Sequence, residues 1–323
     1  MAAIRPSLAR LAGAALLLSA TAGPLAAQAP AYPPDRITLI VAFAPGGFVD
    51  SFARIIGQKL NEKWGKAVTV ENKAGAGGNT GAAQVAGAKP DGLTLLVTST
   101  AIAINETLYK KRDYSLDQLV PVSISVSSPE TIATHPSKPG TLKEYLAWAK
   151  GNDINFATAG VGSGSHLAAE YFLKVIAKTP ATHIPFRGGA LSVQAALGNQ
   201  VDMVASSFGI IPQVQEGKLK GLAVASQSRV AAMPDVPTYT EAGFPFVAES
   251  WVAVLAPAKT PPAIVEALNA AIGEMLADPA NRSKLLGMGY QIQNRSVPET
   301  SAYLKDEVSK WGEMVRTVGA TVE

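Results

Sequence analysis

Residues 37–64 read ITLIVAFAPGGFVDSFARIIGQKLNEKW, an apolar run, a glycine turn and an amphipathic stretch in immediate succession. The run 37–43 predicts a strand, and the apolar residues of 51–64 recur at helical spacing. A strand that stops at glycines and restarts as a helix leaves backbone N–H groups without partners at the positive end of the helix dipole. The turn at 45–47 is therefore predicted to hold a carboxylate or a phosphate.

Strands and helices continue to alternate after this turn. Strands are predicted over 68–71 and 93–98, with a helix over 80–88 between them. Strands separated by helices build a parallel sheet that is covered on both faces and binds ligands at the carboxyl ends of its strands. The turn at 45–47 lies at such an end.

A second set of the same kind follows. Thr141 and Glu144 form a predicted capping box at a helix start, and the glycine-rich segment 160–165 follows a short strand. The other elements of this set are predicted strands over 155–158, 183–185 and 201–205 and predicted helices over 166–178 and 190–197. The chain thus has two similar halves, each with a glycine turn after a strand.

Two β-prone passages connect the halves. Residues 119–134 are interpreted as one connecting strand, and 250–257 as a strand that returns to the first half. Two crossings make a hinge, and hinged lobes can close around a ligand. The predicted fold class is α/β, with two α/β domains joined by two hinge strands and a ligand cleft between them. We expect lobe 1 to span 30–124 plus 254–323, and lobe 2 to span 125–253.

The N-terminal segment 1–29 is predicted to be a signal peptide. It has a basic start, an apolar stretch over 11–18 that is too short to span a membrane, and a small-residue cleavage site. We expect export, with cleavage near Ala27 or Ala29. Because the chain contains no cysteine, it has no disulfides and no lipid anchor at this site.

The composition excludes several classes of partner. Removal of the signal peptide leaves 26 of the 28 basic residues against 25 acidic ones, and the lysines and arginines form no cluster that would track the phosphates of a nucleic acid. No later segment reaches the ~18 consecutive apolar residues of a membrane span. Three scattered histidines show no metal-ligand spacing, so we expect no metal and no cofactor.

The segment 160–165 is a poor dinucleotide fingerprint, because Ser165 replaces the last glycine and no acidic residue follows about 20 positions later. It fits better as a polar cup in which Thr158, Ser163 and Ser165 supply hydroxyls and the glycines let a ligand approach the backbone. Neither glycine loop contains a cation, so N–H groups, hydroxyls and water would meet an anion.

Two charged residues lie close to these loops. Asp50 either caps the helix that follows the first turn or faces the cleft, where it would favour a ligand with an amine. Arg187 lies beside Gly188 at a strand end, where its guanidinium suits a carboxylate, although a structural ion pair explains it nearly as well.

In these stretches the sequence resembles the periplasmic solute receptors of the tripartite tricarboxylate transporter family, also called Bug receptors. The matching stretches, in order along the chain, are 32–36, 44–50, 70–78, 89–92, 186–190, 198–202, 234–243 and 251–261. The resemblance implies a periplasmic-binding-protein fold of type II-like form, located in the periplasm. It implies a receptor, not an enzyme, that binds a small organic carboxylate and delivers it to membrane permease subunits. We expect a monomer without catalytic residues.

The resemblance also assigns ligand-binding residues to the two loops. Those matched by position are Pro45, Gly46, Gly47 and Asp50 in the first loop and Thr158, Ala159, Gly160, Ser163 and His166 in the second. Ser99 and Asn105, after the third strand, are further candidates. Phe48, Arg187, Gly188 and Ser206 complete the predicted site.

Two features depart from the family pattern. Phe48 stands where the family often has a small or polar residue, and we interpret it as an exposed loop aromatic that favours an aromatic or longer aliphatic acid. Ser206 and Ser207 stand where an acid or amide is frequent, which reduces the charge near the ligand.

Two other functions remain open. A secreted hydrolase would need a nucleophile beside a base, but Ser165 and His166 are adjacent on a helix and point about 100° apart. A sensor that signals to a membrane kinase would share every binding feature and differ only in its partner.

Overall fold

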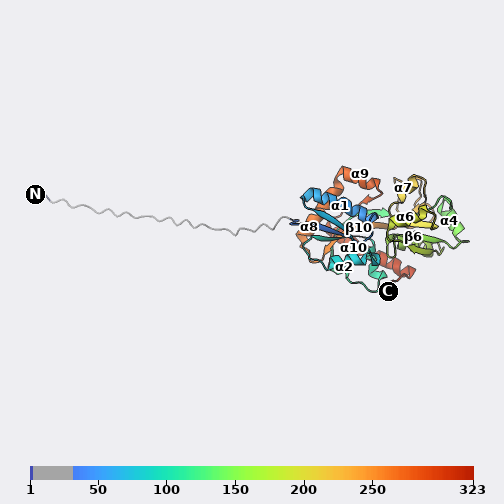
Figure 1. Cartoon of the computed structure of the whole chain (residues 1–323), viewed down its shortest axis with the longest axis horizontal. Coiled ribbons are helices and arrows are strands. Elements are labelled where there is room, and N and C mark those ends of the chain that lie inside the picture. Colours follow the sequence, from blue (N-terminus) through green and yellow to red (C-terminus); the bar gives the residue numbers. More distant parts are fainter. Residues whose placement is uncertain (3–31) are drawn as a thin grey trace. The chain divides into compact units, whose positions relative to one another are not determined.

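The computed structural model describes residues 1–2 and 32–323. The predicted cleavage positions, Ala27 and Ala29, therefore lie outside the described residues. From Tyr32 to Glu323 the chain forms one compact unit that contains two β-sheets and their covering helices (Figure 1).

The first sheet has six strands in the order β11-β4-β10-β3-β1-β2. Their bounds are β1 Ile37–Val41, β2 Val68–Asn72, β3 Thr94–Ser99, β4 Leu119–Pro129, β10 Glu249–Pro257 and β11 Gln291–Ile292. Strands β1, β2 and β3 are parallel, whereas β10 is antiparallel to both β3 and β4. The expected parallel sheet is thus extended by antiparallel strands, because β10 enters from the other half of the chain.

The second sheet has five strands in the order β7-β6-β8-β5-β9. Their bounds are β5 Thr131–Thr134, β6 Asn155–Thr158, β7 Thr182–Pro185, β8 Met203–Ser206 and β9 Lys220–Val224. Strands β6, β7 and β8 are parallel, and β5 is antiparallel to β8 and β9. Each sheet defines one lobe of the α/β fold.

Helices cover these sheets. With the first sheet lie α1 Phe48–Trp64, α2 Asn79–Ala86, α3 Ala101–Leu108, α8 Pro262–Ala277, α9 Pro279–Gly287 and α10 Val297–Val318. With the second lie α4 Leu142–Ala149, α5 Gly164–Tyr171, α6 Gly189–Leu197 and α7 Ile210–Gln215, and α5 continues through a π-helical turn over Phe172–Ile176. None of the described helices has the length and apolar character that a membrane span requires.

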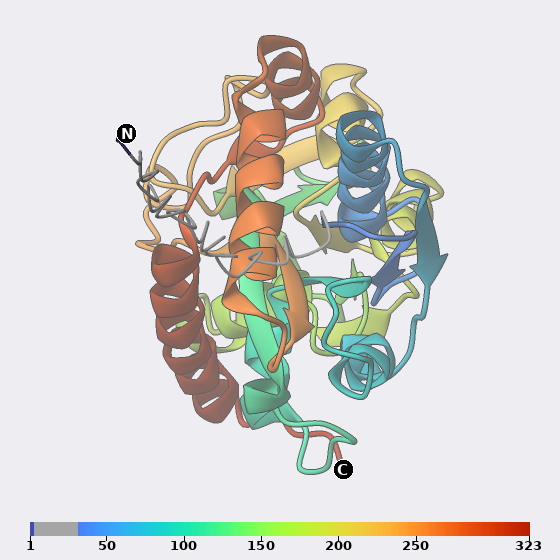
Figure 2. The same cartoon turned by 90° about the vertical axis from the view of Figure 1, so that its left-hand side faces the viewer.

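Both faces of the first sheet are buried, which explains the unbroken apolar run of β1. Leu39 and Val41 lie in the core formed with α1 and α8, and Ile40 and Ala42 lie in the core formed with α2, α3 and α10. Successive side chains of a strand point to opposite faces, so a strand covered on both faces is apolar throughout. Figure 2 shows α1 and α8 beside one another on their face of this sheet.

The passage 119–134 is two strands and not one, because the chain changes sheets at Glu130. The Glu130 N–H donates to the Ala248 carbonyl, and the Glu130 carbonyl accepts from the Ala225 N–H. Strand β10 makes the second crossing when it returns to the first sheet. The C-terminal helix adds a further connection, because Lys174 Nζ donates to the Val318 carbonyl, 2.6 Å away.

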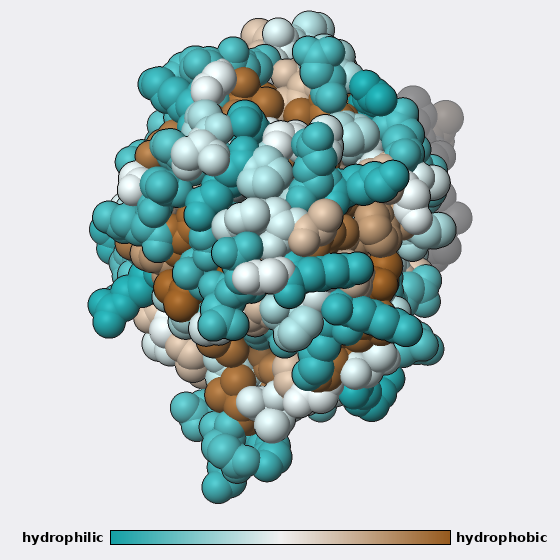
Figure 3. All heavy atoms as spheres, turned by 90° about the vertical axis from the view of Figure 1, so that its right-hand side faces the viewer, coloured by the Kyte–Doolittle hydropathy of each residue, from teal (hydrophilic) through white to brown (hydrophobic). Residues whose placement is uncertain are grey.

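Several elements differ from the sequence-based prediction. Helix α1 begins at Phe48 instead of Ser51, since Gly47 already has the extended conformation of an N-cap. Helices α3 Ala101–Leu108 and α7 Ile210–Gln215 and strands β9 and β11 are absent from the prediction. The capping box of Ser296 and Glu299 at the start of α10 is present. The face drawn in Figure 3 is mainly hydrophilic, with apolar residues in small groups.

Candidate functional site

The two glycine loops follow equivalent strands of the two sheets. Strand β1 lies between β2 and β3, and strand β6 lies between β7 and β8. In each sheet the chain therefore continues to one side of the central strand and then to the other. Ligands of open α/β sheets bind at such switch points, beyond the carboxyl ends of the strands. The fold therefore places the two predicted loops at the switch points of the two sheets, where ligands of such folds bind.

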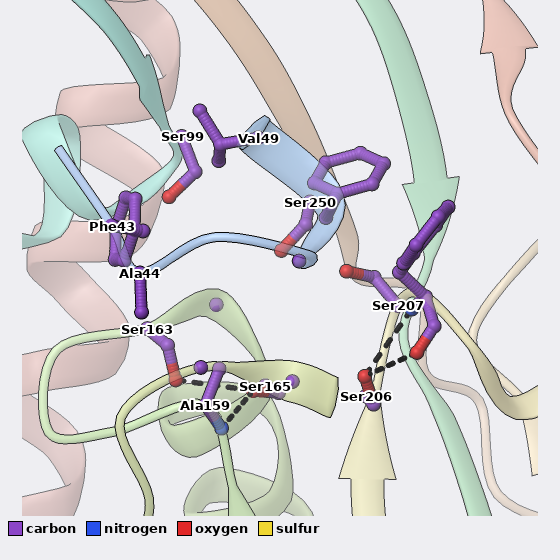
Figure 4. Close-up of a pocket in the computed structure, with 16 residues that line it drawn as sticks. Phe43, Ala44, Val49, Ser99, Ala159, Ser163, Ser165, Ser206, Ser207 and Ser250 are labelled. Atoms are coloured by element: carbon purple, nitrogen blue, oxygen red, sulfur yellow. Dashed lines mark hydrogen bonds between the residues drawn. The ribbon is translucent and has the colours of Figure 1, made fainter. Parts of the chain in front are cut away.

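A small inner cavity of about 50 Å³ lies between the loops (Figure 4). Its lining from the first lobe is Phe43, Ala44, Gly47, Phe48, Val49, Ser99 and Ser250. Its lining from the second lobe is Ala159, Ser163, Gly164, Ser165, Gly188, Gly189, Ser206, Ser207 and Phe208. The predicted ligand-binding residues that line this cavity are Gly47, Phe48, Ser99, Ala159, Ser163, Gly188 and Ser206.

A wider outer cavity of about 600 Å³ adjoins the inner one and shares Phe43, Ala44, Ala159 and Ser163 with it. The predicted residues Gly160 and Arg187 line the outer cavity. The remaining lining residues are Ala42, Ala74, Gly75, Ala76, Gly77, Gly78, Tyr109, Val161, Pro185 and Phe186. The segment over Gly75–Gly78, part of the matching stretch 70–78, therefore contributes to the outer wall.

Three helices begin at the inner cavity. The N-caps of α1 and α6, Gly47 and Gly188, provide no side-chain acceptor, so the first N–H groups of these helices have no side-chain cap. The N-cap of α5, Ser163, accepts a hydrogen bond from the His166 N–H. Each helix start carries partial positive charge, and three that converge favour an anion.

Hydroxyl groups supply most of the side-chain polarity of the inner cavity. Six serines line it, and Figure 4 shows Ser163, Ser165, Ser206, Ser207 and Ser250 around one space. No charged side chain of the described residues lines this cavity. An anion here would be held by N–H groups and hydroxyls, as the absence of cations in the two loops predicted.

Asp50 is buried below the first turn and contributes to neither cavity. Its Oδ2 accepts from the Gly46 N–H at 2.9 Å, and its carboxylate pairs with Arg54 and accepts from Asn72. Burial raises the pKa of Asp50, but the hydrogen bonds from Arg54, Gly46 and Asn72 outweigh it and keep the carboxyl ionised. This carboxylate fixes the shape of the turn, so its role is structural, but the N-cap of α1 is Gly47 and not Asp50.

His166 is buried in the second lobe, also outside both cavities. Its Nδ1 accepts from the Gly162 N–H at 3.4 Å, and its ring stacks on His183. The Thr158 hydroxyl lies 2.6 Å from His183 Nε2, and Thr158 does not line the inner cavity. Burial lowers the pKa of His166 to about 3 and that of His183 to about 4, so both rings are neutral at neutral pH.

Pro45 and Gly46 also lie outside the two cavity linings. Gly46 has a φ of +82°, a conformation that glycine adopts without strain, and its N–H is used by Asp50. The first turn therefore presents Gly47 to the cavity, whereas its other residues set the path of the chain. Asn105 is buried and donates to the Gly77 carbonyl and to Asn79.

Phe48 lines the inner cavity, but it is the first residue of α1 and belongs to the core, not to an exposed loop. Its ring stacks on Tyr290 with 5.1 Å between centroids, and its carbonyl accepts from the Tyr290 hydroxyl. Phe208 lies beside both rings. Phe43, Phe48, Val49 and Phe208 give the cavity an apolar wall.

Sequence reasoning missed Phe43, Phe208 and Ser250 as lining residues. Phe43 and Phe208 each lie two residues after the end of a strand, β1 and β8. This position could have predicted that they line the site, because ligands bind beyond the carboxyl ends of such strands. Ser250 lies within β10, and the pairing of β10 with β4 and β3 brings it to the loops. No local pattern in the sequence announces that pairing.

The fold and the cavity together define a two-lobed binding protein. Residues 52–320 match the family model described as "Tripartite tricarboxylate transporter family receptor", and the chain belongs to this family. Its members are binding proteins, a class without enzymatic activity.

Solved structures of relatives share the fold over most of the chain. The periplasmic binding protein BugD is 32% identical, with a TM-score of 0.85, and the match covers 90% of this chain and 100% of that one. Rpa4515 of R. palustris, solved with adipate, is 26% identical, with a TM-score of 0.86 and coverage of 90% and 100%. MatC (Rpa3494) of Rhodopseudomonas palustris, solved with bound malate, is 32% identical, with a TM-score of 0.83 and coverage of 88% and 100%.

Proposed function

We propose that this protein is an extracytoplasmic receptor that binds one small organic carboxylate in the inner cavity and delivers it to the permease of a tripartite tricarboxylate-type transporter. The observation that carries the proposal is the convergence of three helix N-termini and six serines on a cavity without an acidic lining residue. Such a cavity attracts an anion through backbone N–H groups and hydroxyls. The receptor acts by binding alone.

The carboxylate group would lie between the starts of α1, α5 and α6. Gly47, Ser163 and Gly188 are the loop residues closest to this role, since each caps one of the helices. Ser99, Ala159 and Ser206 complete the polar wall among the predicted residues. Asp50, Thr158 and His166 support the loops from behind.

The remainder of the ligand would contact the apolar wall of Phe43, Phe48, Val49 and Phe208. Aliphatic carbons buried there gain about 25 cal/mol per Å² of apolar surface. A second carboxylate would extend into the outer cavity toward Arg187. Adipate, found in one relative, and malate, found in another, have this two-ended form, and they are the first compounds to test.

The proposed location is the periplasm, reached through a signal peptide that is cleaved near Ala27 or Ala29. The lobes would bind and release ligand by hinging at the two crossings, with sheet membership changing at Glu130 and between β9 and β10. We expect a monomer that contacts the membrane subunits of the transporter with its closed form.

Isothermal titration calorimetry with adipate and malate tests the proposal. Gly47→Leu adds a side chain at a residue that lines the inner cavity, where φ is −89° and the nearest atom to a new Cβ is 3.9 Å away. The expected result is a loss of affinity of about a hundredfold, which corresponds to about 3 kcal/mol.

Gly287→Leu is the matched control, because it makes the same change at the end of α9, where a Cβ meets no atom within 4 Å. It should bind as the unmodified protein does. If the Gly47→Leu variant bound adipate and malate as tightly as the unmodified protein does, the ligand would not lie in the inner cavity. Failure of the unmodified protein to bind any acid of a wider aliphatic and aromatic panel would remove the proposed function.

A further inference from the structure

Glu130 is a buried carboxyl at the point where the chain crosses from the first sheet to the second. Glu130 separates β4 from β5 and is only 3% exposed. Backbone hydrogen bonds to Ala248 and Ala225 hold it on both sides. The backbone at Glu130 is therefore held on both sides, and the side chain is buried.

The Glu130 side chain lies directly behind the wall of the inner cavity. The Ser250 hydroxyl is hydrogen-bonded to Glu130 Oε1, and Ser250 lines the cavity (Figure 4). Gly164, the first residue of α5, packs against the pair. A Cβ at Gly164 would lie 2.2 Å from Ser250 Oγ and 2.9 Å from Glu130 Oε1. The glycine is required because the pair occupies this space at the start of α5.

Among residues 32–323, no lysine, arginine or histidine forms an ion pair with Glu130 that would balance an ionised carboxyl. Strand β10 presents the Ser250 hydroxyl, helix α5 presents the backbone of Gly164, and the segment before β10 presents the buried, neutral Tyr239. None of the ion pairs among the described residues includes Glu130, and its Oε2 has no hydrogen-bond partner there. Burial raises the pKa of Glu130 to about 8, against the smaller opposing effect of the Ser250 hydrogen bond.

The protonation state of Glu130 decides what the Ser250 hydroxyl can offer. A neutral carboxyl can donate its proton to Ser250 Oγ, which frees the Ser250 O–H to donate into the cavity. An ionised carboxyl accepts the Ser250 O–H and leaves only lone pairs toward the cavity. It also competes with a bound anion for the positive end of α5.

We propose that Glu130 is a positioning residue for the ligand, which in its neutral form aims the Ser250 hydroxyl at a bound carboxylate and in its ionised form weakens binding. The inference rests on the proposed carboxylate-binding function of the inner cavity. It adds a prediction that the cavity alone does not make, namely that binding the anion is coupled to retention or uptake of one proton at a site that the ligand does not touch.

The test is calorimetric titration of the full-length mature protein with adipate and malate from about pH 6.5 to about pH 9.5, a range in which both acids stay fully ionised. The expected affinity falls about tenfold from pH 7 to pH 9, because only the fraction with neutral Glu130 binds tightly. Titrations at about pH 8 in two buffers of different ionisation enthalpy should reveal uptake of about half a proton per ligand.

Glu130→Gln replaces the carboxyl with a group that cannot ionise, so its affinity should be independent of pH and its proton uptake should be absent. Glu307→Gln is the matched control, because Glu307 is equally buried at 4% exposure but its hydrogen-bond partners, Trp251, Lys310 and Trp311, line neither cavity. It should retain the pH profile of the unmodified protein. If the Glu130→Gln protein does not fold, Ser250→Ala serves in its place. We expect this variant to bind more weakly than the unmodified protein at pH 6.5, and its affinity to fall less between pH 6.5 and pH 9.5.

A flat pH profile without proton uptake in the unmodified protein would overturn this inference and leave the proposed function intact. An unaltered profile in Glu130→Gln would also overturn it. If neither adipate nor malate nor any other acid of the panel bound at pH 6.5, the proposed function would fail and this inference with it.

Discussion

The imidazole rings of His166 and His183 lie face to face, with their centroids 4.1 Å apart and their planes inclined by 26°. His183 stacks in turn on Phe156, and its Nε2 meets the Thr158 hydroxyl. His166 accepts the Gly162 N–H. Two neutral rings thus support the second ligand loop from within the lobe.

This pair predicts a loss of stability in acid. The pKa values of about 3 for His166 and about 4 for His183 lie below the ordinary value of 6.5. Between pH 6.5 and pH 3 the unfolded chain therefore binds more protons at these two residues than the folded chain does. The stabilisation is complete above pH 6.5 and is lost as the pH falls through 4 and 3. Urea unfolding between about pH 7 and about pH 4 should show the decrease.

The variant His183→Phe keeps a stacked ring but cannot be protonated. Its unfolding free energy should fall less steeply with acid than that of the unmodified protein. Parallel curves for the two proteins would show that these histidines do not cause the acid loss.

Glu307 predicts a large effect on stability without a change in specificity. One oxygen, Oε2, accepts from the indole N–H of Trp251 at 2.7 Å and of Trp311 at 2.8 Å, and all three residues are buried. Glu307→Ala leaves two buried donors unpaired, at a cost of about 3 kcal/mol or more in unfolding free energy. Glu313→Ala, at an exposed position of the same helix, should change it by less than about 0.5 kcal/mol. Equal effects in chemical denaturation would contradict this account.

Asp50 predicts a coupled loss of stability and affinity. Asp50→Ala removes the acceptor of the Gly46 N–H and leaves Arg54 and Asn72 without their partner. We expect a loss of about 2 kcal/mol in stability and about tenfold in affinity for adipate, since the first turn loses its fixed shape. Arg54→Ala should cost no more than about 1 kcal/mol, because the arginine is about half exposed and its pair with Asp50 is screened by solvent. A larger loss of stability and affinity in Arg54→Ala than in Asp50→Ala would contradict the claim that Asp50 fixes the shape of the first turn.

Phe208 predicts a change in ligand preference. It contributes to the apolar wall of the inner cavity and, unlike Phe48, it is not part of a helix start. Phe208→Ala removes apolar contact worth about 1 kcal/mol for a four-carbon chain, so adipate should lose about fivefold in affinity. Malate, with its shorter and more polar backbone, should lose less. The ratio of the two dissociation constants is the measurement, and an unchanged ratio would exclude Phe208 from the wall that the ligand contacts.

The local patterns of the chain predicted the elements around the site well. The run 37–43 is apolar because both faces of β1 are covered, and the glycines after it mark the turn to α1. The same reasoning located β6 and the loop before α5. These features depend on neighbours in sequence, and so a sequence reveals them.

The contacts between distant segments were beyond such patterns. Residues 119–134 are mostly β-prone, and although Pro129 and the single charge at Glu130 mark a break, no local pattern shows that the two parts join different sheets. Ser250 reaches the cavity because β10 pairs with β4 and β3, and its own partner, Ser128, lies about 120 residues earlier in the chain. The interpretation of Phe48 as an exposed loop residue was wrong because Tyr290 and Phe208, far away in sequence, cover it.

The central claim is that a carboxylate binds between the starts of α1, α5 and α6. A crystal structure of the mature protein grown with saturating adipate tests it most directly. The account predicts density in the inner cavity, with one carboxylate within hydrogen-bonding reach, directly or through water, of the Gly47 and Gly188 loops and of Ser163. Adipate found only outside this cavity, or an empty cavity in a protein that binds adipate in solution, would contradict it.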